Sequence, residues 1–369
     1  MLLTGRRPGA LPLPPLSPRV YLQRRSSRLP FPLDQTGCSL FSRARHGLLQ
    51  GVRAVGLTPG DEVLVPAYHH GSEVQALVEA GLRCRFYEAT VSLAPDQDEL
   101  ESLLGPRVRA LHLVHYLGFP QDAPRWRAWC DARGLLLIED AAQSWLASSQ
   151  GRPVGSFGHL AIFCVYKSFG VPDGALLVSS RPAAAPGGRR RSGAREVLAR
   201  HRQWLQQFTW RPPGRRPPPE PAEPYDPALD FAMGDADALP YGLSVTLLPK
   251  VVRTQAALTR RRNYRYLLER LPGTVAPLFG DLPEGAVPFV FPVASADKAG
   301  LVRRLRQHGI AALDFWSVPH PSLPAEQFPR ARALRASVVG LPVHQELRQA
   351  SLRRMVTALW STHEPLAPT

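Results

Sequence analysis

A lysine and an aspartate at the ends of two apolar segments are the residues of this sequence that first suggest chemistry. Lys167 follows the largely apolar residues 160–166, and no other lysine occurs in the first 249 residues. Asp140 follows residues 135–139 (LLLIE) and precedes two alanines, which leave room for another molecule. A lysine amine can form a Schiff base, and a carboxylate can keep a ring nitrogen protonated. Because a buried charge is costly unless it has a partner, the pair indicates a cofactor site.

Pyridoxal 5'-phosphate (PLP) requires both of these groups, so we expect Lys167 and Asp140 to bind this cofactor and to act in catalysis. Its phosphate needs hydrogen-bond donors, which a helix starting near residues 42–45, after the turn at 36–38, can supply. A flat side chain over the cofactor ring can come from residues 68–70 (YHH), just after a strand that ends at Pro66.

Simpler interpretations of these residues also exist. An isolated aspartate after a strand is more often a helix N-cap, and an isolated lysine is usually solvated. The occurrence of both at strand ends favours the cofactor site. His69 and His70 could form a metal pair, but adjacent side chains point apart, and His112 and His115 have no carboxylate nearby in the sequence. We therefore expect packing or stacking at these histidines, and no metal site.

The elements that must position these residues alternate between helix and strand. Leu40, Leu48, Val52 and Val55 lie on one face of an expected helix, and Gly56 and the turn at 58–60 end it. The expected strands are 62–65, 83–87, 108–116, 135–139, 160–166 and 175–179, and helices are expected at 71–80, 96–104 and 123–133. Near-continuous apolar strands separated by helices predict an α/β fold with a largely parallel sheet, whose ligands bind at the carboxyl ends of the strands.

The remaining segments divide the chain into three predicted regions. Residues 1–33 are a Pro- and Arg-rich lead-in, residues 34–240 form a large domain, and residues 241–369 form a smaller α+β domain. Within the large domain, residues 182–227 read as an Arg/Pro-rich linker or surface insertion with one helix near 196–208. The small domain is expected to contain a long helix at 247–271, a strand at 287–293, and helices at 298–308 and 349–359.

At these residues the sequence resembles the DegT-type family of PLP-dependent aminotransferases, which is best known for the amination of sugar nucleotides and shares the aspartate aminotransferase fold. The resemblance covers about residues 40–360, and its blocks occur in a shared order. They are 60–66 (GDEVLVP), 114–118 (VHYLG), 138–143 (IEDAAQ), 151–158 (GRPVGSFG), the segment around Lys167, 260–264 (RRRNY) and 341–344 (LPVH).

The resemblance implies a role for each matching residue. Lys167 would be the Schiff-base lysine, Asp140 the partner of the pyridine nitrogen, Gln143 the neighbour of the ring hydroxyl, and His70 the stacking residue. It also implies a homodimer that transfers an amino group from Glu or Gln to a keto sugar on a nucleotide carrier, in polysaccharide or antibiotic biosynthesis.

Three positions depart from the family pattern. Its Ser-Gly-Thr phosphate loop falls on Arg43, Ala44 and Arg45, whose arginines could still pair with phosphate. Cys164 stands where a phosphate-binding serine is usual, and the Asn-containing turn of the second domain reads 241–244 (YGLS) here. Two alternatives therefore stay open: a PLP-dependent sugar dehydratase, or a member without turnover that acts as a binding or regulatory protein through residues 182–227.

Composition is compatible with a globular cytoplasmic enzyme. The formal charge is +15, but only three of the 45 basic residues are lysines, a bias that a GC-rich genome produces without selection for binding, so we expect no nucleic-acid partner. The four cysteines form neither a zinc pattern nor a disulfide framework. No apolar run reaches the roughly 20 residues of a spanning helix, so no membrane partner is expected.

Overall fold

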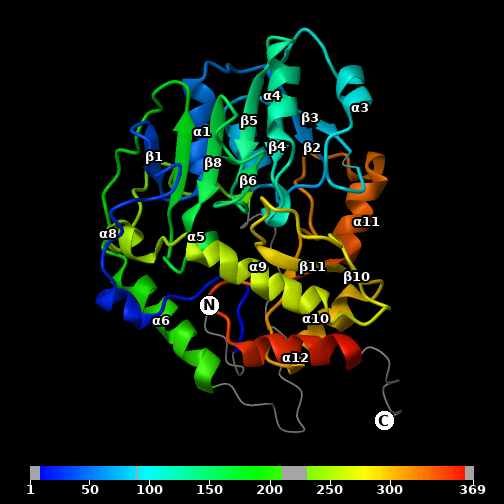
Figure 1. The fold of residues 1–369 in the computed structure, drawn as a ribbon. Coiled ribbons are helices and arrows are strands. Elements are labelled where there is room, and N and C mark those ends of the chain that lie inside the picture. Colours follow the sequence, from blue (N-terminus) through cyan, green and yellow to red (C-terminus); the bar gives the residue numbers. More distant parts are fainter. Residues whose placement is uncertain (1–8, 89, 210–230, 362–369) are drawn as a thin grey trace.

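A seven-stranded sheet forms the centre of the computed structural model, which describes residues 9–88, 90–209 and 231–361 (Figure 1). Parallel pairing links β8, β5, β4, β2 and β3, whereas β9 runs antiparallel to both of its neighbours. The predicted α/β fold with a mostly parallel sheet is confirmed. In spatial order the strands are β1 (Cys38–Phe41), β9 (Ala175–Ser179), β8 (Leu160–Cys164), β5 (Leu136–Asp140), β4 (Val108–Val114), β2 (Glu62–Pro66) and β3 (Arg83–Tyr87).

Helices cover this sheet because successive strand residues point to opposite faces. On β5, Ile138 belongs to the core with Leu48 of α1, whereas Leu137 belongs to the core with Trp126 of α4. Both faces of the strand are thus apolar and buried, as its continuous apolar sequence predicts. The helices of this part are α1 (Ala44–Ala54), α2 (Ser72–Glu79), α3 (Gln97–Ser102), α4 (Ala123–Asp131), α5 (Val165–Ser168) and α6 (Ala194–Thr209).

A second, four-stranded sheet is antiparallel and lies beside the first (Figure 1). Its strands in spatial order are β10 (Ala276–Pro277), β11 (Val290–Ala294), β13 (Val338–Pro342) and β12 (Leu313–Asp314). The helices that follow α6 in the described chain are α8 (Gly242–Val251), which packs with residues of the large sheet, and α9 (Gln255–Leu268), α10 (Lys298–Gln307), α11 (Pro329–Ser337) and α12 (Gln349–Trp360). Among the described residues, no helix has the length and apolarity needed to cross a membrane.

Four predicted elements differ from the structure. The strand expected at 108–116 ends at Val114, and Tyr116 begins a short 3-10 helix. Leu40 lies in β1 and not in the helix, because residues 38–41 pair with β9. The strand expected at 160–166 ends at Cys164, and Lys167 lies on the short helix α5. The long helix expected at 247–271 is two helices, because Val252 adopts an extended conformation and is buried in the core.

The segment 182–227, expected to be a linker or surface insertion, contains a helix that packs on the protein. Val197 of α6 is 3% exposed and belongs to a core cluster with Leu247 and Val252. His201 of the same helix hydrogen-bonds the main-chain oxygen of Leu16 at 2.9 Å. The helix predicted near 196–208 is thus present as α6, and one of its faces packs on the core, whereas Arg189 is exposed. Residues 210–227, including the predicted surface arginines Arg215 and Arg216, lie outside the described residues.

The described part of the lead-in is tied to the second sheet region. Ala10 forms a main-chain bridge with Ile310. His344, fully buried, donates from Nε2 to the main-chain oxygen of Leu11 at 2.9 Å, while its Nδ1 accepts from the N–H of Glu346 at 3.2 Å. These two bonds fix a neutral imidazole, because protonation would put a hydrogen on the accepting Nδ1.

The neutral His344 predicts a loss of stability in acid. Burial, with a contribution from Arg260, lowers the pKa of His344 from its usual 6.5 to about 3. Between these pH values the unfolded chain binds a proton that the folded chain does not, so stability falls as the pH drops below about 6.5. We expect a loss of ~1.4 kcal/mol per pH unit between pH 6 and pH 4 from this residue alone. The free energy of unfolding, measured with urea at several pH values in this range, should fall less steeply with decreasing pH in His344→Gln than in the wild type. An equal dependence on pH in the two proteins would contradict the prediction.

Candidate active site

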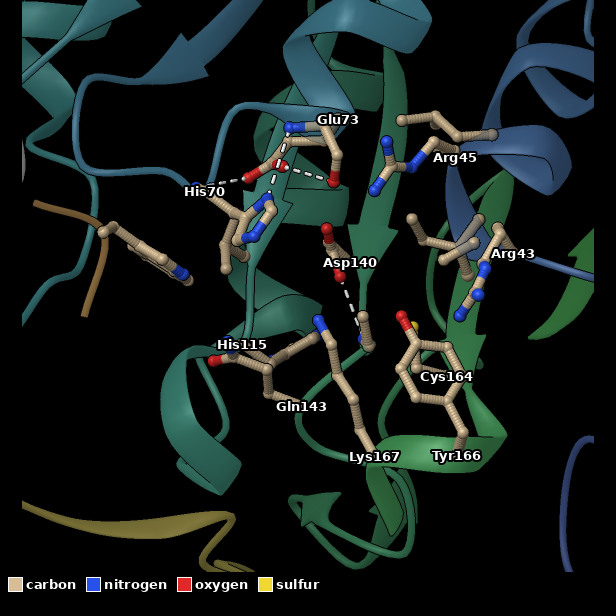
Figure 2. Close-up of a pocket in the computed structure, with 17 residues that line it drawn as sticks. Arg43, Arg45, His70, Glu73, His115, Asp140, Gln143, Cys164, Tyr166 and Lys167 are labelled. Atoms are coloured by element: carbon tan, nitrogen blue, oxygen red, sulfur yellow. Dashed lines mark hydrogen bonds between the residues drawn. The ribbon is translucent and has the colours of Figure 1, made fainter. Parts of the chain in front are cut away.

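A cavity opens where β5 and β8 end and α1 and α2 begin (Figure 2). Every residue predicted for the site lies on it. In Figure 2, Lys167 and Asp140 point toward one another, with Arg43 and Arg45 on one side and His70 on the other. The lining residues are Arg43, Ala44, Arg45, Leu48, His70, Ser72, Glu73, Val114, His115, Asp140, Ala142, Gln143, Ile162, Cys164, Tyr166, Lys167 and Trp316.

Lys167 is held in the cavity by α5, directly after β8. Burial by itself lowers the pKa of this lysine, but its acidic neighbours outweigh burial and raise that pKa; they are Cys164, Tyr166, Asp140 and Glu73. Burial raises the pKa of the thiol and of the phenol, so both are uncharged at neutral pH. The carboxylates of Asp140 and Glu73 are therefore the groups that supply negative charge near the lysine.

Asp140 is anchored at the end of β5. Its Oδ1 accepts a hydrogen bond from the N–H of Ala142 at 2.9 Å, and its Oδ2 lies 3.7 Å from His112 Nε2. Burial and the nearby Glu73 raise the pKa of Asp140, whereas His112 lowers it. The carboxylate is thus fixed in direction, with a raised affinity for a proton that a ring nitrogen could share.

Glu139, the residue before Asp140, organises the loop that follows β7 (Arg152–Pro153), a role that the sequence did not reveal. Its carboxylate is fully buried and accepts from the N–H groups of Gly155 at 2.8 Å, Phe157 at 2.7 Å and Gly158. It also pairs with His115 Nε2 at 2.9 Å. Burial opposes ionisation, but these donors win and lower the pKa of Glu139.

His70 is positioned by Glu73, a second residue that the sequence did not reveal. Glu73 accepts hydrogen bonds from the N–H groups of His70 at 3.0 Å and Gly71 at 3.1 Å, at the start of α2. Although burial opposes ionisation of Glu73, the neighbouring His70 and His69 lower its pKa to about 2. The anion therefore holds the turn that carries His70 into the cavity.

Trp316 closes the cavity from the region of the second sheet. Its φ angle is +51°, which is rare for a bulky side chain and costs about 1–3 kcal/mol. The indole packs against Tyr68, with ring centroids 4.9 Å apart, and meets His70 edge-on. Nothing in the local sequence signals this strained conformation, so Trp316 could not be predicted to line the cavity.

Gln143 and Cys164 occupy two further cavity positions. Gln143 Oε1 accepts from the N–H of Leu117 at 3.0 Å, which leaves its amide nitrogen free to orient toward a ligand. Cys164 is buried at the end of β8 beside Tyr166, and burial raises the pKa of its thiol. A neutral thiol is a weaker hydrogen-bond donor than a serine hydroxyl.

Arginines replace the hydroxyl donors expected along one side of the cavity. Arg43 lies over the ring of Tyr166, with its guanidinium carbon 5.2 Å from the ring centroid. Arg200 of α6 is largely buried near both residues, and burial followed by Arg43 lowers its pKa. Arg45 donates to the main-chain oxygen of Ala232. Within the described part of the chain, none of the three arginines forms an ion pair with a carboxylate.

Residues 38–360 match the DegT/DnrJ/EryC1/StrS aminotransferase family. The chain belongs to this family. The resemblance predicted from residues 40–360 is thereby confirmed. Lys167, Asp140 and Gln143 all line the cavity. Members of the DegT/DnrJ/EryC1/StrS family are PLP-dependent.

Individual members of the DegT/DnrJ/EryC1/StrS family are similar over part of the chain. UDP-N-acetyl-3-dehydro-alpha-D-glucosamine 3-aminotransferase of Acidithiobacillus ferrooxidans is 33% identical over 143 residues, 36% of this chain and 37% of that protein. GDP-perosamine synthase of Vibrio cholerae is 32% identical over 130 residues, 34% and 35% of the two chains. The aligned part thus spans little more than a third of these relatives.

Solved structures extend the likeness of the fold across most of the chain. DesV of S. venezuelae superposes with a TM-score of 0.66 at 22% identity, covering 89% of this chain and 85% of its own. A Bacillus subtilis protein described with bound cofactor PMP gives a TM-score of 0.62 at 17% identity, covering 88% and 72%. At these identities the superpositions show the fold alone.

Proposed function

We propose that this protein is a PLP-dependent aminotransferase that moves an amino group from Glu or Gln to a keto sugar carried by a nucleotide, or to a similar ketone. The observation that carries the proposal is the convergence of Lys167 and Asp140 on one cavity, with their side chains pointing toward one another. The substrate class rests on the activities for which the two relatives described above are named.

The residues present fit PLP. Bound at Lys167, the cofactor would act as an electron sink for the carbon that carries the amino group. Asp140 would hold a proton at the ring nitrogen, because its carboxylate is buried and fixed by the N–H of Ala142. His70 would stack on the ring, and Gln143 would orient the ring hydroxyl. Lys167 Nζ would move a proton at the substrate carbon.

Positively charged side chains would bind the cofactor phosphate in this protein, at the positions where other family members use hydroxyl groups. The N-cap residue of α1 makes no side-chain hydrogen bond, and Ala44 and Arg45 of the first turn line the cavity, so their N–H groups could serve as donors. Arg43 and Arg45 line the same side, and the buried Arg200 lies close to Arg43. Cys164 would contribute only a weak contact. Helix N-termini and arginines without carboxylate partners both favour a multiply charged anion.

This arrangement predicts that Arg43 recognises the phosphate and not the ring. In Arg43→Ala we expect the dissociation constant for PLP to rise roughly 10–100-fold, the range for a hydrogen bond to a charged group. The dissociation constant for pyridoxal, which lacks the phosphate, should change little. Spectral titration with both ligands measures the difference, and Arg189→Ala, which removes an exposed arginine, is the matched control. Equal weakening of both ligands would contradict the assignment.

We also propose a cytoplasmic homodimer, as the family resemblance implies. Light scattering of the purified protein tests the assembly, and a monomer that turns over substrate would overturn it.

The reaction itself is tested by adding amino donors to the PLP-loaded protein. We expect Glu or Gln to convert the bound cofactor to its amine form, with the original spectrum restored by a keto sugar nucleotide. A protein that binds PLP but responds to no donor would favour the alternative of a member without turnover. Loss of a hydroxyl group from the sugar, without gain of an amine, would favour the dehydratase.

A further inference from the structure

A fully buried histidine behind Asp140 has no hydrogen-bond partner. His112 is 0% exposed, and neither of its ring nitrogens has a partner within hydrogen-bonding distance. A buried polar group without a partner typically costs about 1–3 kcal/mol, so its presence asks for an explanation. Asp140 Oδ2 lies 3.7 Å from His112 Nε2.

The strand register places His112 on the side of Asp140 away from the cavity mouth. Asp140 on β5 lies opposite Val114 on β4, and His112 lies opposite Ile138. His112 and Val114 are two residues apart, so they share a face of the sheet. Val114 lines the cavity, whereas His112 lies one step deeper in the same strand.

Two neighbours act on Asp140 in opposite directions. Glu73 of α2 carries a negative charge that disfavours a second anion nearby. His112 is the strongest of the influences that favour the ionised carboxylate, ahead of the Ala142 N–H and Lys167. Removal of His112 would leave burial and Glu73 less opposed, and Asp140 would then keep its own proton in place of sharing it.

We propose that His112 is a positioning residue for Asp140: it donates a hydrogen bond from Nε2 to the carboxylate from behind, and so keeps Asp140 ionised and directed at the ring nitrogen of PLP. A small closure of the 3.7 Å separation makes this bond, which would satisfy Nε2, one of the two unpartnered ring nitrogens. This inference rests on the proposed function, because the ring nitrogen belongs to the proposed cofactor.

The test compares His112→Leu with His112→Gln, which keeps a donor, using PLP titration and the absorbance spectrum of the bound cofactor as readouts. We expect His112→Leu to weaken PLP binding and to lower kcat by roughly tenfold or more each, with little change in KM for the amino donor. The pH at which the bound cofactor changes colour should shift in His112→Leu, and His112→Gln should restore most of the wild-type behaviour. His344→Leu, which removes a buried imidazole far from the cavity, should lower thermal stability and leave this colour change in place.

A double-mutant cycle with Asp140→Asn completes the test. If His112 acts through Asp140, then His112→Leu added to Asp140→Asn should cause no further loss. Additive losses, or a His112→Leu protein that is merely less stable with an unchanged spectrum, would overturn the proposal. If His112→Leu does not fold, the comparison of His112→Gln with His112→Asn replaces it. Only the longer amide side chain of glutamine reaches Asp140, so the spectra of the bound cofactor should differ between these two variants. Identical spectra would contradict the proposal. A wild-type protein that forms no PLP spectrum would instead overturn the proposed function, and this inference with it.

Discussion

Replacing Lys167 with alanine is expected to abolish the covalent link to PLP and to reduce transamination by at least about 10³-fold. The lysine has two functions in the proposed reaction, since it binds the cofactor and moves the proton at the substrate carbon, and a positioned proton-transfer group alone contributes about 10²–10⁴-fold. Among the residues that line the cavity, Lys167 is the one primary amine. A neighbouring side chain therefore cannot take over its role.

The measurement is the absorbance of the PLP-loaded protein, with Lys250→Ala as a matched lysine replacement outside the cavity. Lys250 lies at the end of α8, where its Nζ donates to the main-chain oxygen of Tyr21. The wild type and Lys250→Ala should both be yellow and release no cofactor on gel filtration. If Lys167→Ala kept the same absorbance band after gel filtration, the cofactor assignment would be wrong.

Replacing Glu139 with glutamine is expected to lower the free energy of unfolding by at least ~1–3 kcal/mol, the cost of leaving a buried hydrogen-bond donor without its acceptor, which is larger when the lost acceptor carries a charge. The carboxylate accepts hydrogen bonds from three main-chain N–H groups and from His115, and it has no exposure to solvent. A glutamine presents one oxygen and one NH₂ group. The NH₂ group of glutamine would face main-chain N–H groups or His115, which are themselves donors. At least one of these buried donors would then be left without an acceptor.

Urea unfolding measures this effect, and Glu326→Gln supplies the control. Glu326 forms an ion pair with Arg332 at the surface, where its side chain is 85% exposed, so its replacement should change stability by less than about 0.5 kcal/mol. A Glu139→Gln protein as stable as the control would mean that the loop after β7 does not depend on this carboxylate. Loss of PLP binding together with stability would show that the same loop supports the cavity.

The sequence carried enough information to predict the fold class and to bring the main site residues together. Apolar runs such as residues 135–139 can only be strands covered on both sides, and this pattern led to the parallel sheet. Because strand ends in such a sheet share an edge, Asp140 and Lys167 could be expected at one cavity. The assigned role of each residue stays a prediction until it is tested.

What could not be predicted depends on contacts between distant segments. Glu73 looks like an ordinary first-turn acid of α2, and its role is visible only once the turn carrying His70 folds back on it. Arg200 lies on a helix that the sequence predicts within an Arg- and Pro-rich stretch, but its position near the cavity follows only from the packing of Val197 in the core. Trp316, whose φ is positive, packs against Tyr68 and Tyr116, two residues distant in the sequence.

The single reversed strand of the large sheet has a consequence for how the protein is made. Cys38 in β1 pairs with Val178 in β9, so the edge that delivers Arg43 to the cavity closes only after the chain as far as β9 is available. Pairing across such a separation is slow and leaves β1 exposed in the meantime. During synthesis, the strands β2, β3, β4, β5 and β8 can pair first and position Asp140 and Lys167. Arg43 reaches the cavity only later, when β1 pairs with β9. Ribosome-bound chains arrested before and after β9 emerges should therefore differ sharply in protease resistance at β1.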